Sequence, residues 1–300
     1  MLCIASFIVL LVLSVFSARF RPYVREAYDC VFRRITFRAC NTGFEVKVRS
    51  TITVALSKRS EGLAKLFNRY FELVSWIFVV SFLVSLGWTI RGGYLFWTTG
   101  SCNGLNQGGF CVLDPSGENN AVSGTGLECR TGGNPIGDLT LENVNIEKKQ
   151  ITFIGCYACK YSKQTYPLIK QLAADYGASV EYVFYPTHRE AEYLLPYDYA
   201  VKQVAPDKYL AWMDRMYILP IEAVADKNQV LQLIKEMGID LTAVEKIASD
   251  SATLSLMQRR VYEIDKTGIY GTPTIFINEK PVVGPKPYRV YRIMLNNSLF

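Results

Sequence analysis

The chain has 300 residues, of which 50% are hydrophobic and 20% are charged, and its formal net charge is +6. This composition excludes an intrinsically disordered chain, and the length suffices for one or two domains with hydrophobic cores. No repeat with a period of about 20–50 residues is found, which excludes solenoid architectures. The sequence has a single histidine, His188, so a histidine-rich metal site is excluded as well.

The charges are divided unevenly along the chain. Residues 19–71 hold twelve Lys and Arg against four acidic residues, whereas residues 92–147 hold only Arg130 against six acidic residues. A basic block can bind nucleic acid or anionic lipid. Because this block lies between two apolar segments, we expect it to meet the lipid bilayer and expect no nucleic-acid partner.

The apolar segments that flank the basic block are residues 1–18 and 73–90, and neither contains a charge. As helices they would each be about 27 Å long, close to the roughly 30 Å of a bilayer's hydrocarbon core. We predict two transmembrane helices, with a signal anchor or cleaved signal peptide as the alternative for the first and a buried core helix for the second. The positive-inside rule then puts residues 19–71 in the cytoplasm. The rest of the chain follows on the extracytoplasmic side (periplasmic or cell exterior) of a two-pass protein in the cell membrane.

Within the basic loop, residues 62–72 are predicted to form an amphipathic helix that leads into the second span. Phe44, Val46 and Val48 alternate with charged residues, which predicts a short strand. Cys30 and Cys40 match no metal-binding spacing, and we expect reduced thiols there.

Residues 91–144 are rich in Gly, Ser and Asn and are predicted to be a linker made mainly of loops. Cys102, Cys111 and Cys129 lie in this linker. Cysteines tend to pair in an oxidising compartment, so we expect one structural disulfide among the three. The sequence does not decide which two cysteines pair.

A Cys-x-x-Cys motif follows a predicted strand at residues 150–154 and precedes a helix predicted over Lys160 to Tyr176. A helix N-terminus stabilises a thiolate and lowers its pKa, so we expect Cys156 to be the exposed, attacking thiol. Cys159 would then resolve the mixed disulfide. A zinc site would need a second such motif or a pair of histidines, so no metal site is predicted.

The residues between the motif and the C-terminus are predicted to be mainly helical. Ser179 to Tyr185 form a second strand, and apolar stripes follow over residues 230–237 and 254–264. Thr242 and Glu245 predict a capping box at the start of a further helix. A third strand follows Gly271-Thr272-Pro273-Thr274.

The Cys-x-x-Cys motif at the head of a helix and the later Thr272-Pro273 before a strand resemble the thioredoxin fold. The helical segment between them resembles the layout of the DsbA family of thiol-disulfide oxidoreductases. The resemblance implies an α/β, thioredoxin-like fold over residues 145–300, with a helical subdomain inserted at about 187–268 and two transmembrane helices before it. It also implies a redox disulfide between Cys156 and Cys159, substrate binding by Thr272, Pro273 and Tyr157, and no cofactor.

These features favour a membrane-tethered, extracytoplasmic enzyme that forms, reduces or isomerises disulfides in secreted or membrane proteins. The alternatives are a carrier of copper or another soft metal and a redox-inert thioredoxin-like scaffold. The expected partners are unfolded or cysteine-containing proteins and a membrane redox protein of the DsbB or vitamin K epoxide reductase-like type.

The sequence departs from the family in two respects, which leave the direction of catalysis open. Tyr157 and Ala158 replace the Pro-His of strongly oxidising members, and no acidic residue lies in the strand before Cys156. His188 is expected at the surface or at a helix start rather than as a proton shuttle.

Overall fold

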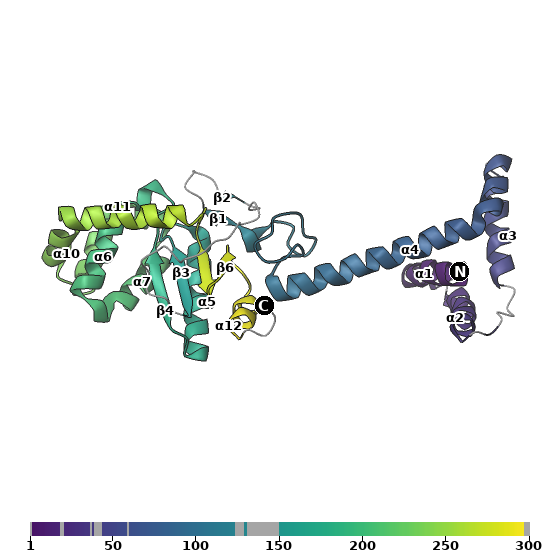
Figure 1. Cartoon of the computed structure of the whole chain (residues 1–300), viewed down its shortest axis with the longest axis horizontal. Coiled ribbons are helices and arrows are strands. Elements are labelled where there is room, and N and C mark those ends of the chain that lie inside the picture. Colours follow the sequence, from purple (N-terminus) through teal and green to yellow (C-terminus); the bar gives the residue numbers. More distant parts are fainter. Residues whose placement is uncertain are drawn as a thin grey trace. The chain divides into compact units, whose positions relative to one another are not determined.

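The structure is a computed structural model, and it describes residues 2–18, 21–36, 38, 44–58, 60–123, 129–130 and 150–296 (Figure 1). The chain divides into two compact units, Met1–Ile90 and Arg91–Phe300. We describe each unit by itself.

The first unit is helical throughout its described residues. It contains α1 (Leu2–Phe16), α2 (Arg21–Ile35), α3 (Phe44–Ser57) and most of α4 (Glu61–Thr99), which changes direction at Tyr70. The strand predicted around residues 44–48 is wrong, because this segment begins α3. Three alternating apolar positions are too few to distinguish a strand from a helix.

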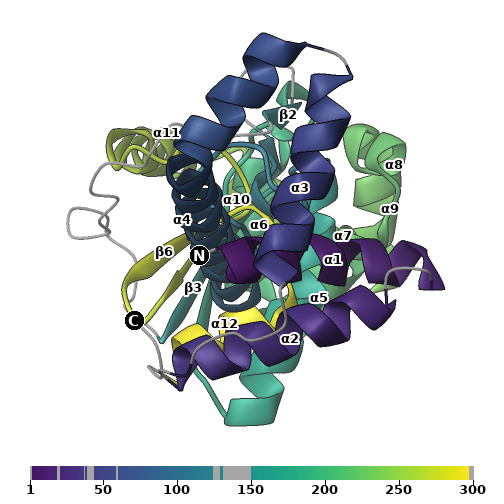
Figure 2. The same cartoon turned by 90° about the vertical axis from the view of Figure 1, so that its right-hand side faces the viewer.

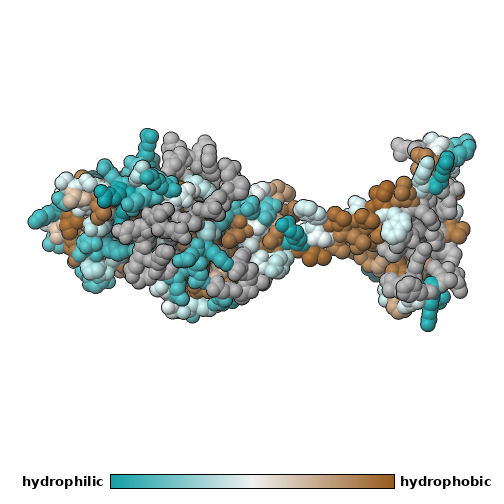
Figure 3. All heavy atoms as spheres, viewed as in Figure 1, coloured by the Kyte–Doolittle hydropathy of each residue, from teal (hydrophilic) through white to brown (hydrophobic). Residues whose placement is uncertain are grey.

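One helix among the described residues is long and apolar enough to cross a membrane by length and composition. It is Leu73–Thr99, which extends the predicted span at 73–90 toward the C-terminus. Hydrophobic residues cover α4 on the face shown in Figure 3, and little of its apolar window is buried. A buried core helix is therefore not what the structure shows. The apolar part of α1 is shorter, so the prediction of two spanning helices is not met within the described residues.

Cys30 in α2 is disulfide-bonded, so the expectation of a reduced thiol there is wrong. Cys40 lies outside the described residues. The spacing of cysteines in this loop matched no metal motif, but it carried no information about pairing in three dimensions.

The second unit is built on one mixed sheet with strand order β4-β3-β5-β6. The bounds of its strands are β3 (Ile151–Gly155), β4 (Val180–Phe184), β5 (Thr274–Ile277) and β6 (Lys280–Val283). β3 pairs with β4 in parallel and with β5 antiparallel, with Ile154 opposite Thr274 and Gly155 opposite Phe184. The ends of β3 and β4 and the start of β5 therefore lie at one edge of the sheet.

Both faces of the sheet are buried, which explains why its central strands are apolar at nearly every position. Alternate residues point to opposite faces of a strand. Phe153 and Ile275 belong to the larger core, with α5 (Lys160–Tyr176) and α12 (Tyr288–Leu295). Ile154 and Phe276 belong to a smaller core, with Ile264 of α11 (Ser251–Lys266).

Helices fill the chain between β4 and β5. Their bounds, with the short 3-10 turns η3 and η4, are η3 (Arg189–Ala191), α6 (Leu194–Val204), η4 (Pro206–Lys208), α7 (Tyr209–Ile218), α8 (Ile221–Ala225), α9 (Lys227–Glu236), α10 (Leu241–Ala248) and α11. Helices α6 and α10 lie side by side in both views (Figure 1 and Figure 2). Asp240 caps α10 by accepting a hydrogen bond from the Ala243 N–H, so the predicted capping box at Thr242 and Glu245 is wrong.

The described part of the linker after α4 packs against the rest of the second unit. It contains η2 (Glu118–Asn120) and two short strands, β1 (Val122–Ser123) and β2 (Cys129–Arg130). The Asn106 side chain binds the outer edge of the edge strand β6, donating to the Pro281 carbonyl at 2.7 Å and accepting from the Val283 N–H at 2.8 Å. Unpaired edge strands invite aggregation, so this contact protects the edge of the sheet.

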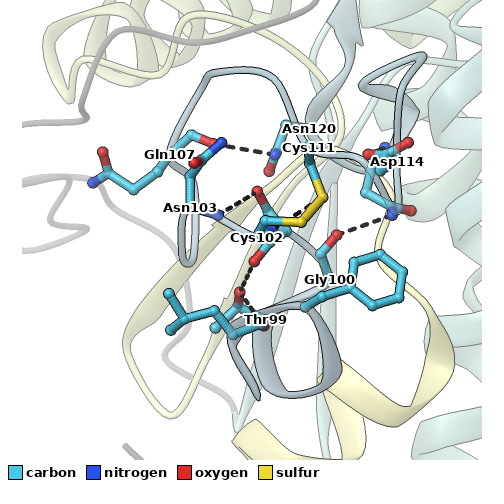
Figure 4. Close-up of a disulfide and its surroundings, with 12 residues drawn as sticks. Thr99, Gly100, Cys102, Asn103, Gln107, Cys111, Asp114 and Asn120 are labelled. Atoms are coloured by element: carbon cyan, nitrogen blue, oxygen red, sulfur yellow. Dashed lines mark hydrogen bonds between the residues drawn. A yellow bond between two sulfur atoms is a disulfide. The ribbon is translucent and has the colours of Figure 1, made fainter. Parts of the chain in front are cut away.

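A disulfide closes the linker loop between Cys102 and Cys111 (Figure 4). Loops on both sides are held by further hydrogen bonds, among them one from the Asn120 side chain to the Gln107 carbonyl at 3.3 Å. This disulfide is one of the pairings left open by the sequence. The Cys129 side chain lies outside the described residues.

Candidate active site

The two cysteines of the motif lie in the turn between β3 and α5, at the edge where β3, β4 and β5 meet. Both are free thiols, and neither side chain is exposed. α5 begins at Lys160, and Cys159 is its N-cap. The prediction that Cys156 stands at the helix N-terminus as the more exposed sulfur is therefore wrong in this structure.

Cys156 is held by contacts from two segments of the chain. Its backbone N–H donates to the Ser162 hydroxyl at 3.2 Å, and hydrogen bonds with Thr187 favour the thiolate. Burial outweighs these bonds and raises the pKa of the Cys156 thiol above its usual value. The sequence had predicted a lowered pKa because the contribution of burial was not visible in it.

The Cys159 sulfur receives the hydrogen bond that an N-cap side chain receives in other helices. It accepts from the Ser162 N–H at 3.3 Å, and its own thiol donates to the Thr272 carbonyl at 3.3 Å. The sulfur thus links the start of α5 to the residue that precedes β5.

Thr272 and Pro273 lie against the motif, joined by a cis peptide bond. Both residues are buried. The Thr272 hydroxyl is 3.0 Å from the hydroxyl of Thr187, which follows β4. The structure therefore brings together Cys156, Cys159 and the Thr-Pro pair, as the sequence predicted.

His188 also lies at this edge. It is the N-cap of η3, which confirms the predicted helix start, but its position beside Cys159 was not predicted. Hydrogen bonding to the Cys159 sulfur raises the pKa of the half-buried His188 ring, while partial burial acts in the opposite direction. The order of the two predicted strands was enough to place His188 near the motif. Parallel strands end at the same edge of a sheet, so a residue just after the second strand lies close to a motif just after the first.

Lys163 lies one turn into α5 and is partly buried, whereas Lys160 at the start of the helix is exposed. The Lys163 amino group donates to the carbonyls of Met216, Tyr217 and Leu219 at the end of α7, at 3.0, 3.3 and 2.6 Å. Burial lowers the pKa of Lys163 to about 8, and negative charge on Cys156 or Cys159 acts in the opposite direction.

Tyr157 points into the core instead of facing a substrate, and only 1% of it is exposed. Its ring stacks on Phe184 with centroids 4.6 Å apart, and its hydroxyl donates to Asp198 of α6 at 2.5 Å. Asp198 accepts further hydrogen bonds from Tyr209 at 2.8 Å and from Trp212 at 3.0 Å. This network, which we name the Asp198 network, ties the motif to the inserted helices. Burial raises the pKa of Asp198, and its three hydrogen bonds oppose that shift.

No cation site was found within the described ranges: no group of three or more His, Cys, Asp or Glu side chains is placed to hold a metal ion.

The comparison with protein families places a DSBA-like thioredoxin domain at residues 169–293. This match covers less than half of the chain. The matched residues begin after the Cys-x-x-Cys motif and include Thr272 and Pro273. No sequence among curated proteins matches this chain.

Several solved structures are similar to about half of this chain. ScsC of Proteus mirabilis in a compact conformation is 20% identical, with 49% of this chain and 81% of that chain covered and a TM-score of 0.42. The thiol-disulfide exchange protein alpha-DsbA2 of Wolbachia pipientis is 21% identical, with coverage of 52% and 86% and a TM-score of 0.43. Reduced DsbA1 of Neisseria meningitidis is 14% identical, with coverage of 55% and 86% and a TM-score of 0.41.

Proposed function

We propose that this protein is a thiol-disulfide oxidoreductase that works through Cys156 and Cys159. The observation that carries the proposal is the pair of free cysteines at a strand–helix junction, packed against Thr272 and Pro273. A DsbA-like thioredoxin domain supports a disulfide-handling role. Two thiols separated by two residues can form a mixed disulfide with a substrate and then resolve it.

The proposed substrates are cysteine-containing proteins that meet the domain outside the cytoplasm. We assign the attack on the substrate to Cys156 and the resolving step to Cys159. Because both sulfurs are buried, we expect the turn around residues 156–159 to open before a substrate reaches them. Thr272 and Pro273 would then hold the peptide beside the sulfur.

We further propose that α4 anchors the domain in a membrane and that the second unit lies on the extracytoplasmic side. The apolar stretch Leu73–Thr99 supports the anchor. The disulfide between Cys102 and Cys111 supports the location, since disulfides persist in oxidising compartments. A membrane partner of the DsbB or vitamin K epoxide reductase-like type would recycle the two cysteines.

The two-pass arrangement, with residues 19–71 in the cytoplasm, is a separate part of this proposal. The charge pattern supports it, and the disulfide at Cys30 argues against it, because the cytosol keeps thiols reduced. Lys58→Cys and Glu118→Cys place a label on exposed positions of the two units. In intact cells a membrane-impermeant maleimide should label only Glu118→Cys, and labelling of both positions would refute the cytoplasmic placement.

The activity is tested by insulin reduction and by oxidation of a dithiol peptide, with the full-length chain in detergent. We expect at least one of the two activities, and we expect it to be lost in Cys156→Ser. Absence of both activities together with stoichiometric copper binding would favour the metal carrier, and absence of both without copper binding would favour the inert scaffold.

A further inference from the structure

This inference rests on the proposed function. It concerns how the Cys159 thiol loses its proton in the resolving step. In the reduced state the Cys159 thiol is fully buried and donates to the Thr272 carbonyl. The nucleophile in disulfide exchange is the thiolate, so this proton must leave before Cys159 can attack. A carbonyl oxygen cannot take it, and a buried site offers bulk water no direct access.

The side chain best placed to accept this proton is His188. Its ring lies next to the Cys159 sulfur, and their interaction raises the pKa of the ring. Its Nε2 atom is buried and has no hydrogen-bond partner. A buried polar atom without a partner costs free energy, so natural structures contain few of them and they often have a function. Because Nε2 has no partner, the ring meets the resolving sulfur through its other nitrogen, Nδ1, and that atom is the proton acceptor.

The other titratable groups around the motif are less suited to this task. Lys163 is engaged with three backbone carbonyls, and Asp198 already accepts three hydrogen bonds. Tyr217 is completely enclosed, and burial raises its pKa well above the usual value. Glu190 is exposed and acts on the His188 ring only through its charge.

We propose that His188 is the proton shuttle of the resolving step. Starting from the mixed disulfide between Cys156 and a substrate, His188 takes the proton of the Cys159 thiol. The Cys159 sulfur attacks the Cys156 sulfur, and the bond between Cys156 and the substrate sulfur breaks. The electron pair of that bond leaves with the substrate sulfur, which takes the proton from His188. The enzyme dithiol is oxidised by two electrons, the substrate disulfide is reduced, and His188 returns to its starting state.

The reverse direction uses the same steps in the opposite order. When a substrate thiolate opens the oxidised motif, His188 protonates the departing Cys159 sulfur. The shuttle therefore serves oxidation and reduction alike. A base whose pKa lies closer to that of the thiol accepts its proton more readily, and contact with the sulfur raises the pKa of His188.

The experiment isolates the resolving step in the full-length chain in detergent. Reduced protein is mixed rapidly with a large excess of glutathione disulfide at fixed pH values between about 5 and 9, so that the adduct on Cys156 forms and is then resolved in the same reaction. Formation and loss of the adduct are followed by acid quenching and mass spectrometry, and the rate of each step is fitted separately. We compare the wild type with His188→Gln and His188→Asn, and with Arg189→Gln as a matched control at the exposed neighbouring position.

The wild-type rate should level off once His188 is neutral, with an inflection above about pH 6.5. In His188→Gln the rate should fall by about 10²–10⁴-fold near neutral pH and should rise about tenfold per pH unit, because hydroxide must then remove the proton. Arg189→Gln should keep the wild-type profile.

Two results would overturn the proposal, and they differ from the failure of the proposed function. A wild-type profile that inflects only at the pKa of a free thiol would exclude His188 as the base. A wild-type profile in His188→Gln or His188→Asn would do the same. If Cys159→Ser, which cannot resolve the adduct, forms none on Cys156 even at about pH 9, the oxidoreductase function itself is wrong, and the shuttle is wrong with it.

Discussion

Two cysteine pairs in the second unit differ in their bonding, because one forms a disulfide and the other does not. Cys102 and Cys111 lie in a loop and are joined in a disulfide with a Cα–Cα distance of 5.3 Å. Cys156 and Cys159 lie in the turn between β3 and α5 and are free thiols. The first pair is surrounded by loop backbone and amide side chains. The second meets a helix N-terminus and the single histidine of the chain.

The comparison teaches that surroundings decide what a cysteine pair does. The linker disulfide closes a loop that packs against β6 through Asn106, so we expect it to stabilise the fold. The pair at the sheet edge lies near His188 and Lys163, which can carry protons and positive charge. We therefore expect the loss of one pair to change stability and the loss of the other to change activity.

The largest expected effect is the loss of exchange activity in Cys156→Ser, because the other thiol of the motif, Cys159, is buried and is assigned the resolving step. Insulin reduction and dithiol oxidation should fall to the uncatalysed rate. The matched control is the double variant Cys102→Ser with Cys111→Ser, which should retain most of the activity at a temperature where it is folded. Equal loss in both variants would contradict the division of roles.

The next effect is on stability. The double variant should lose about 2–3 kcal/mol of unfolding free energy, since a short disulfide loop restricts the unfolded chain by about that amount. Urea unfolding of the full-length chain in detergent, followed by tryptophan fluorescence, measures the difference. An unchanged midpoint would mean that the other linker contacts hold the loop without the disulfide.

A smaller effect is expected at the Asp198 network. Tyr157→Phe removes one of three hydrogen bonds to a buried carboxyl group, which should cost about 1–3 kcal/mol of unfolding free energy. Tyr193→Phe, which removes a hydroxyl that donates to the Val224 carbonyl, is the control outside the network. If both variants lose the same free energy, the network has no special role in holding the motif.

The last effect appears only as a dependence on pH, and it concerns Lys286, which packs the linker onto the domain. Its amino group donates to the Asn119 carbonyl and to the Asn120 side chain, and burial lowers its pKa to about 7. Between about pH 7 and 10 the unfolded state binds more protons at this lysine than the folded state. The free energy of unfolding should therefore rise with pH in this range, by at most about 1.4 kcal/mol per unit from this one group.

Lys286→Met tests this contribution, because it keeps the length of the side chain and removes the titrating group. The variant should show a flatter dependence of unfolding free energy on pH than the wild type. Identical slopes between pH 7 and 10 would show that Lys286 is protonated normally in the folded protein.

Much of the second unit could be predicted from local sequence signals. Apolar patterns predict the helix at Lys160–Tyr176 and the strands around residues 151 and 275, and Gly and Pro residues mark their ends. The Thr272–Pro273 pair could be placed beside the motif only through the family resemblance. No local pattern joins residues separated by more than a hundred positions.

The errors arose where burial or pairing in three dimensions decides the outcome. Cys156 was expected to be exposed with a lowered pKa, and the structure buries it. The inward turn of Tyr157 depends on Asp198, which occupies a core position between Leu194 and Val201 on α6. An acidic residue in such an apolar stripe was a signal of a buried polar network, and the sequence analysis did not use it.

The most direct test of the account is the identity of the sulfur that carries a trapped substrate. Cys159→Ser blocks the resolving step, so mixed disulfides should accumulate in cells that express the full-length variant. Mass spectrometry of the purified complexes should find the substrate bonded to Cys156. A substrate bonded to Cys102, Cys111 or Cys129 instead would contradict the account and would move the reactive centre into the linker.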